Sequence, residues 1–178
     1  LADVGEDTIV HCPSCQYAAN LEKASGIIQN ERSVARRQLT DQPSRVHTPG
    51  VTSIKQLSQF LRIEPMQIIK SIAVQAEGTP VIVLVRGDLE INEIKLKLVL
   101  GVQEITMLTE TEITALGSIA GFIGPIGLSS VKLIADTSIK GLTNAVVGAN
   151  EADYHLQYVD VQRDLTELTY ADVRNVGE

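Results

Sequence analysis

The feature that most constrains the fold is an almost continuous apolar run at residues 80–86, "PVIVLVR". A strand that is apolar on both faces is typical of a central position in a sheet, because neither face meets water. The preceding stretch at 68–75, "IIKSIAVQ", also reads as a strand, and the segment containing Gly78 suits a hairpin connection. We therefore predict a sheet built around this hairpin, with its second strand buried.

Helices are predicted to alternate with strands along the rest of the chain. After a cap at Thr52 or Ser53, one buried helical stripe is formed by Ile54, Leu57, Phe60 and Leu61. Further helices are expected at 91–101, ending near Gly101, and after a capping-box pattern at Thr109 or Thr111. Strands are predicted at 8–11, 104–108, 131–136, 145–150 and 154–161, and a helix start at 17–24. The fold class is therefore mixed α/β, with helices packed on a twisted sheet.

Residues 118–128, "SIAGFIGPIGL", place three glycines and one proline within an apolar stretch. Glycine permits positive φ and close approach of another backbone or a ligand, while proline fixes φ and lacks an N–H donor. The stretch is thus incompatible with a regular helix or strand. It is either a tight turn between two elements or a loop whose N–H groups hold a polar ligand.

Composition excludes some classes of function. Aromatic residues make up 3% of the chain, tryptophan is absent and the net charge is −7, so a broad nucleic-acid surface built on stacking and positive charge is not expected. The composition does not exclude a focused pocket for one nucleotide. The 178 residues contain no signal-peptide pattern and no apolar run that could span a bilayer, so we expect a cytoplasmic chain with no membrane partner.

Two cysteines, Cys12 and Cys15, form the motif "CPSC", a spacing that suits zinc or redox chemistry. A closed zinc site needs four ligands, and the sequence has no second such pair. We therefore expect two thiols and no metal.

Three polar residues stand in or beside predicted strands. Lys70 lies among isoleucines and must point to solvent, find a carboxylate or line a cleft. His155 is either a half-buried strand histidine or a site residue, and Asp136 can simply cap the following turn. The sequence has no GxSxG elbow, Walker loop or dinucleotide fingerprint, so water or the substrate must supply any nucleophile.

Several stretches together resemble one family, the insertion (editing) domain of bacterial prolyl-tRNA synthetase, which is related to YbaK-type deacylases. In chain order the stretches are "LADVGEDTIVHCPSCQYAANLEKA", "TPGVTSIKQLSQFL", "IIKSIAV", "LVRGDLEINEIKLK", "GFIGPIGL", "IADTS" and "VVGANEADYHLQYVDVQRDL". The resemblance covers nearly the whole chain. It implies the YbaK-like fold and the hydrolysis of alanine mistakenly esterified to proline tRNA.

The resemblance also implies roles for individual residues. Lys70 matches the family's functionally important lysine and is expected to anchor the terminal nucleotide or polar groups of the substrate. His155 follows the "GAN" motif and is expected to line the amino-acid pocket; we take these two as the catalytic candidates. The expected substrate-binding residues are Thr48, Gly121, Gly124, Pro125, Asp136 and Asn150.

By the same resemblance, residues 1–45 form an arm from the synthetase core, 46–162 the editing domain and 163–178 the return segment. The editing domain needs no cofactor, while ATP and Mg²⁺ belong to the core, and the parent enzyme is expected to be a homodimer. The partner is the 3′ end of proline tRNA carrying alanine. The main alternative is a noncatalytic insertion that positions tRNA. A second, a free-standing deacylase acting in trans, is disfavoured by the arm, because the stretch "GEDTIVHCPSCQYAAN" is not needed in a minimal deacylase.

Overall fold

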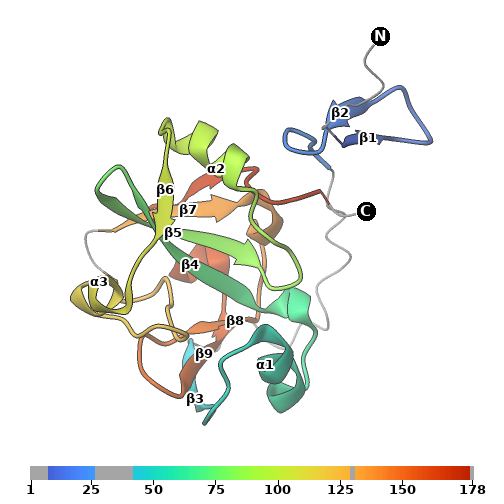
Figure 1. Ribbon diagram of the computed structural model, residues 1–178. Helices are drawn as coiled ribbons and strands as arrows, with labels where there is room; N and C mark the ends of the chain where they lie inside the picture. Colours follow the sequence, from blue (N-terminus) through green and yellow to red (C-terminus); the bar gives the residue numbers. More distant parts are fainter. Residues whose placement is uncertain (1–7, 27–41, 129–130, 177–178) are drawn as a thin grey trace.

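The computed structural model describes residues 8–26, 42–128 and 131–176 and has a mixed α/β architecture (Figure 1). Its main sheet has the strand order β10-β7-β5-β4-β6. The strands are Ile69–Ala76 (β4), Thr79–Arg86 (β5), Ile105–Met107 (β6), Lys132–Asp136 (β7) and Thr169–Ala171 (β10). β5 pairs antiparallel with β4 and parallel with β7, which confirms the predicted hairpin and the central place of the apolar run.

A second, antiparallel sheet has the order β3-β9-β8. Its strands are Ser44–His47 (β3), Tyr154–Val159 (β9) and Ala145–Gly148 (β8). A parallel bridge between Ile68 and Val146 joins the two sheets, so β8 runs beside the beginning of β4. This junction positions the site described below.

The helices begin and end at residues suited to these positions. α1 (Ile54–Leu61) starts with a capping box between Ser53 and Gln56, and α3 (Glu110–Ala115) starts with one at Thr109. α2 (Glu93–Leu100) ends at Gly101 in the left-handed conformation, with φ of 72°. The remaining short helices are η1 (Pro65–Gln67), η2 (Thr137–Ile139) and α4 (Val161–Asp164). Helix 54–61 is confirmed, but Phe60 is 50% exposed and so does not belong to the buried stripe.

Apolar residues cover both faces of the main sheet. On one face, Ile69, Ile82 and Leu84 pack against β8, β9 and α3. On the other, Val83 and Ile134 pack against Leu96 of α2. The two faces are therefore covered by different elements. Because side chains alternate along a strand, odd- and even-numbered residues of β4 point to opposite faces of the sheet.

The N-terminal part of the described chain is a hairpin of β1 (Ile9–His11) and β2 (Ala18–Asn20). The predicted strand at 8–11 is confirmed, whereas the predicted helix start at 17–24 is wrong. An isolated helical segment this short is marginal in water. Pairing with β1 satisfies backbone groups of β2, so the strand forms instead.

The C-terminal part of the described chain contributes to the same folded unit. β10 lies within residues 163–178, the predicted return segment, and pairs in parallel with β7. Val173 is fully buried, and Arg174 donates a hydrogen bond to the carbonyl of Gly26 at 2.6 Å. The main sheet thus includes a strand from residues 163–178. Among the described residues, no helix combines the length and apolarity needed to cross a membrane.

Candidate functional site

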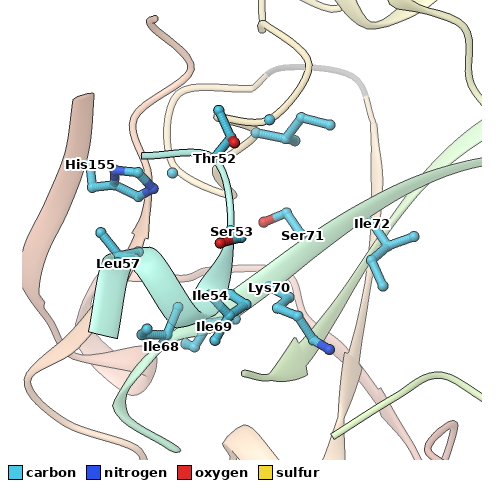
Figure 2. A pocket seen from close by; sticks show the side chains of 13 residues that line it. Thr52, Ser53, Ile54, Leu57, Ile68, Ile69, Lys70, Ser71, Ile72 and His155 are labelled. Carbon is cyan, nitrogen blue, oxygen red and sulfur yellow. The ribbon is translucent and has the colours of Figure 1, made fainter. Parts of the chain in front are cut away.

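A pocket of about 230 Å³ opens where the N-terminal end of α1, β4 and the end of β8 meet (Figure 2). Lys70, Gly121 and His155, which come from three separate parts of the sequence, line it together. Its aliphatic wall is formed by Ile54, Leu57, Ile68, Ile69 and Ile123. The pocket is smaller than typical small-molecule sites of roughly 300–1,000 Å³. Its size and lining suit a small apolar group attached to a polar one.

His155, on β9, is held from behind by Thr48. The Oγ1 atom of Thr48 and Nδ1 of His155 lie 2.7 Å apart and share a hydrogen bond, and the backbone N–H of Thr48 donates to the carbonyl of Asp153 at 2.8 Å. Thr48 is fully buried and does not line the pocket, so it acts on the site through the imidazole. The ring of Phe122 also packs against the imidazole in an edge-to-face arrangement, with the centroids of the two rings 5.6 Å apart.

Burial lowers the pKa of His155 below the ordinary histidine value. The side chain is therefore neutral at pH 7. The hydrogen bond to Thr48 uses Nδ1, so Nε2 is the ring nitrogen left for a further hydrogen bond. A neutral imidazole in an apolar pocket can accept or donate one hydrogen bond there without carrying a charge.

This pKa shift predicts a pH-dependent stability. The unfolded chain protonates its histidine near pH ~6.5, before the buried ring does, so the native state loses stability as the pH falls from there to the lowered pKa. Compared with a His155→Asn variant, the wild type should lose more free energy of unfolding between pH 8 and pH 5. Urea denaturation at several pH values measures this, with His11 and His47 present in both proteins. A difference between the two proteins that stays constant with pH would contradict it.

The glycine-containing loop at residues 118–128 reaches the pocket because its backbone at Gly124 crosses the backbone of β8 at Gly148 in close contact. A Cβ atom on Gly124 would lie 1.7 Å from the carbonyl oxygen of Gly148, so neither residue has room for a side chain. Gly121 has φ of 87°, faces open space and lines the pocket. The loop therefore has both properties that the sequence allowed, close approach and positive φ.

Asn150 braces this loop from inside. Its Oδ1 accepts hydrogen bonds from the N–H of Gly124 and the hydroxyl of Ser118, both at 2.8 Å, and its Nδ2 donates to the carbonyl of Ile126 at 2.8 Å. The N–H of Gly124 is thus already used and is not offered to a ligand. Neither Asn150 nor Gly124 lines the pocket, so both act by shaping the loop.

Lys70 lies at the edge of the pocket and points away from His155 in Figure 2. Its Nζ donates to Oε1 of Glu90 at 2.7 Å. The Lys70 side chain is only 14% exposed, whereas that of Glu90 is 75% exposed. The lysine stem is therefore part of the wall, and its ammonium group sits at the rim, where it can meet a charged group arriving from solvent.

Two predicted residues lie elsewhere. Asp136 is fully buried at the end of β7, where its carboxylate accepts from the backbone N–H groups of Ser138 and Val173 and pairs with Arg174. The structure does not bring it to the pocket, and its cap of η2 matches the simpler expectation. Pro125 is buried and borders a different hollow. Neither residue is part of this site.

Sequence reasoning missed three hydroxyl residues that line the pocket: Thr52, Ser53 and Ser71. Ser71 follows Lys70 directly and therefore projects to the opposite face of β4. It separates the core residues Ile69 and Ala73 on that face, and this polar interruption of an apolar stripe was the available signal.

The described residues contain no cluster of three or more histidine, cysteine or acidic side chains that could hold a metal ion. Cys12 and Cys15 are free thiols in the turn of the β1–β2 hairpin. Hydrogen bonds from the backbone of Ser14 and from Cys15 lower the pKa of the Cys12 thiol.

Comparison with known proteins places the pocket in context. Residues 48–165 match the family model described as an aminoacyl-tRNA editing domain. A proline–tRNA ligase of Geobacter sulfurreducens is 44% identical over 177 residues, which is 99% of this chain and 30% of the ligase. A proline–tRNA ligase of Bacillus pumilus is 39% identical over 180 residues, 100% of this chain and 32% of the ligase. The chain thus spans about a third of the length of these curated relatives.

Solved structures share the fold. One, described as a candidate trans-editing enzyme for prolyl tRNA synthetase, has a TM-score of 0.67 and 21% identity and covers 75% of this chain and 87% of its own. Another, described as a hypothetical protein, has a TM-score of 0.66 and 18% identity, with 75% and 92% coverage. The mixed α/β fold expected from the sequence is the fold of these proteins.

Proposed function

The chain belongs to the aminoacyl-tRNA editing domain family, and from this premise we propose that it hydrolyses the ester of alanine mistakenly joined to proline tRNA. The relatives are proline–tRNA ligases, so we infer that the chain is the editing domain of a prolyl-tRNA synthetase. The observation that carries the proposal is the shared pocket of about 230 Å³ lined by Lys70, Gly121 and His155.

The need for such a pocket follows from the limits of steric selection. A site shaped for proline cannot exclude the smaller alanine, and missing methylenes discriminate by only ~1–3 kcal/mol. A second pocket that admits a methyl side chain and rejects a five-membered ring selects in the opposite direction. The small aliphatic wall formed by Leu57, Ile68 and Ile69 suits this task.

The reaction is attack of water on the ester carbonyl, which releases alanine and the free hydroxyl of the terminal ribose. The buried ring of His155 bounds the amino-acid pocket, and Gly121 brings bare backbone to it. Lys70 holds the terminal nucleotide from the rim. Thr48, Gly124 and Asn150 support these groups through the contacts described above.

The wider setting is also proposed. We expect no cofactor in the editing domain, with ATP and Mg²⁺ used by the remainder of a homodimeric synthetase, in the cytoplasm. The substrate is the 3′ end of proline tRNA carrying alanine. The two alternatives to a cis-acting editing domain are a noncatalytic tRNA-positioning insertion and a deacylase acting in trans.

Incubation of this chain with alanyl- and prolyl-charged proline tRNA tests the proposal. Alanine should be released at least ~10-fold faster than prolyl ester is cleaved, because the pocket favours the smaller side chain. Release is followed with radiolabelled amino acid, and spontaneous hydrolysis is measured without protein. Equal cleavage of both esters would refute the selectivity. Binding of tRNA without any cleavage would favour the noncatalytic alternative.

A further inference from the structure

Ser71 carries a buried hydroxyl with no hydrogen-bond partner in the described part of the chain. The residue is the third of β4 and lines the pocket, and in Figure 2 its oxygen points toward the side where Thr52 and Ser53 lie. A buried hydroxyl without a partner is unfavourable, and such groups are uncommon in native proteins. A bound ligand would supply the missing partner.

Apart from Nε2 of His155, the other polar side-chain groups described near the pocket are already engaged or face water. The hydroxyl of Ser53 caps α1, since it accepts from the N–H of Gln56 at 3.3 Å and donates to Oε1 of Gln56 at 3.0 Å. Thr52 is exposed, and the N–H of Gly124 is bonded to Asn150. Among the described residues that line the pocket, the buried polar side-chain groups left available are therefore the Ser71 hydroxyl and Nε2 of His155, and of these the Ser71 hydroxyl is a buried group with no partner.

We propose that the Ser71 hydroxyl donates a hydrogen bond to the acyl carbonyl oxygen of the aminoacyl ester, which makes Ser71 a catalytic residue; this rests on the function proposed above. Water attacks the carbonyl carbon, and the carbonyl π electrons move to the oxygen, which becomes negatively charged. The hydroxyl of Ser71 stabilises that charge. Collapse of the intermediate re-forms the carbonyl and breaks the bond to the ribose oxygen, which takes the proton that water loses.

The test compares single-turnover and steady-state deacylation by the wild type, Ser71→Ala and Ser71→Thr. Removal of a donor that acts as charge develops should lower kcat by about 10²-fold and change KM little. Ser71→Thr keeps the hydroxyl and should recover much of the rate. Ser71→Ala should melt at the wild-type temperature or above it, because it removes a buried hydroxyl that had no partner.

Ser138 provides a matched control. Its hydroxyl is also buried without a partner among the described residues, but it lies in η2 and does not line the pocket. Ser138→Ala should deacylate at the wild-type rate. Folded Ser71→Ala with wild-type kcat would overturn the proposal.

A second measurement separates this proposal from the proposed function. If the wild type releases no amino acid from any charged tRNA, the function fails, and binding of an uncleavable 3′-amide analogue of alanyl-adenosine then decides the role of Ser71. Weaker binding to Ser71→Ala than to the wild type and Ser138→Ala supports the carbonyl contact. Equal binding, or none, overturns it.

Discussion

Gly124→Ala is expected to destabilise the whole domain and to abolish deacylation. The added Cβ atom would lie 1.7 Å from the carbonyl oxygen of Gly148, far inside the ~3.5–4.0 Å at which non-bonded carbon contacts are favourable. The opposing atom belongs to the backbone of β8, so it cannot rotate away as a side chain would. We expect the free energy of unfolding to fall by ~3 kcal/mol or more.

The control is Gly127→Ala in the same loop. Gly127 has φ of 88° and nothing within 4 Å of its added Cβ, so alanine there incurs only the cost of a left-handed backbone, ~1–2 kcal/mol. Urea denaturation of both variants, followed by circular dichroism, separates the clash from the conformational strain. Equal stability of the two variants would show that the crossing of the chains is looser than the structure has it.

The parts of the fold that the sequence predicts correctly depend on local information. The hairpin of β4 and β5, the cap at Ser53 and the stop at Gly101 are each encoded by a few neighbouring residues. The predictions of a buried Phe60 and of a helix at 17–24 are wrong because both rest on local sequence patterns, whereas tertiary contacts decide the structure at these positions. Phe60 falls at the margin of the face that Leu57 buries, and the segment 17–24 has β1 beside it.

The site was predictable only in part for a related reason. Resemblance to a family indicated Lys70, Gly121 and His155, and these three do share a pocket. The crossing of Gly124 with Gly148 and the bond between Thr48 and His155 join residues far apart in the sequence, so no pattern in one stretch reveals them. Asp136 shows the opposite case: the family motif suggested a substrate-binding residue, but its carboxylate holds together buried backbone and Arg174 away from the pocket.

Lys70→Met is expected to reduce kcat/KM for alanine release by about 10²-fold or more while leaving the fold intact. Methionine keeps an unbranched stem along the pocket wall but removes the ammonium group that pairs with Glu90. Because that partner is largely exposed, loss of the ion pair should change the free energy of unfolding by less than ~1 kcal/mol. If Lys70 contacts the phosphates of the terminal nucleotides, the variant should also show a weaker dependence of KM on salt concentration.

Two further variants test whether the loss of activity is specific to the ammonium group of Lys70. Lys97→Met removes a similar ion pair, with Glu93 at 2.7 Å, but on α2 outside the pocket, and should keep the wild-type rate. Glu90→Gln frees the ammonium of Lys70 without removing it and should retain deacylation, since the substrate then meets no competing carboxylate. A Lys70→Met protein that is unstable as well as inactive would instead indicate a structural lysine. Wild-type kcat/KM in a stable Lys70→Met protein would remove Lys70 from the site altogether.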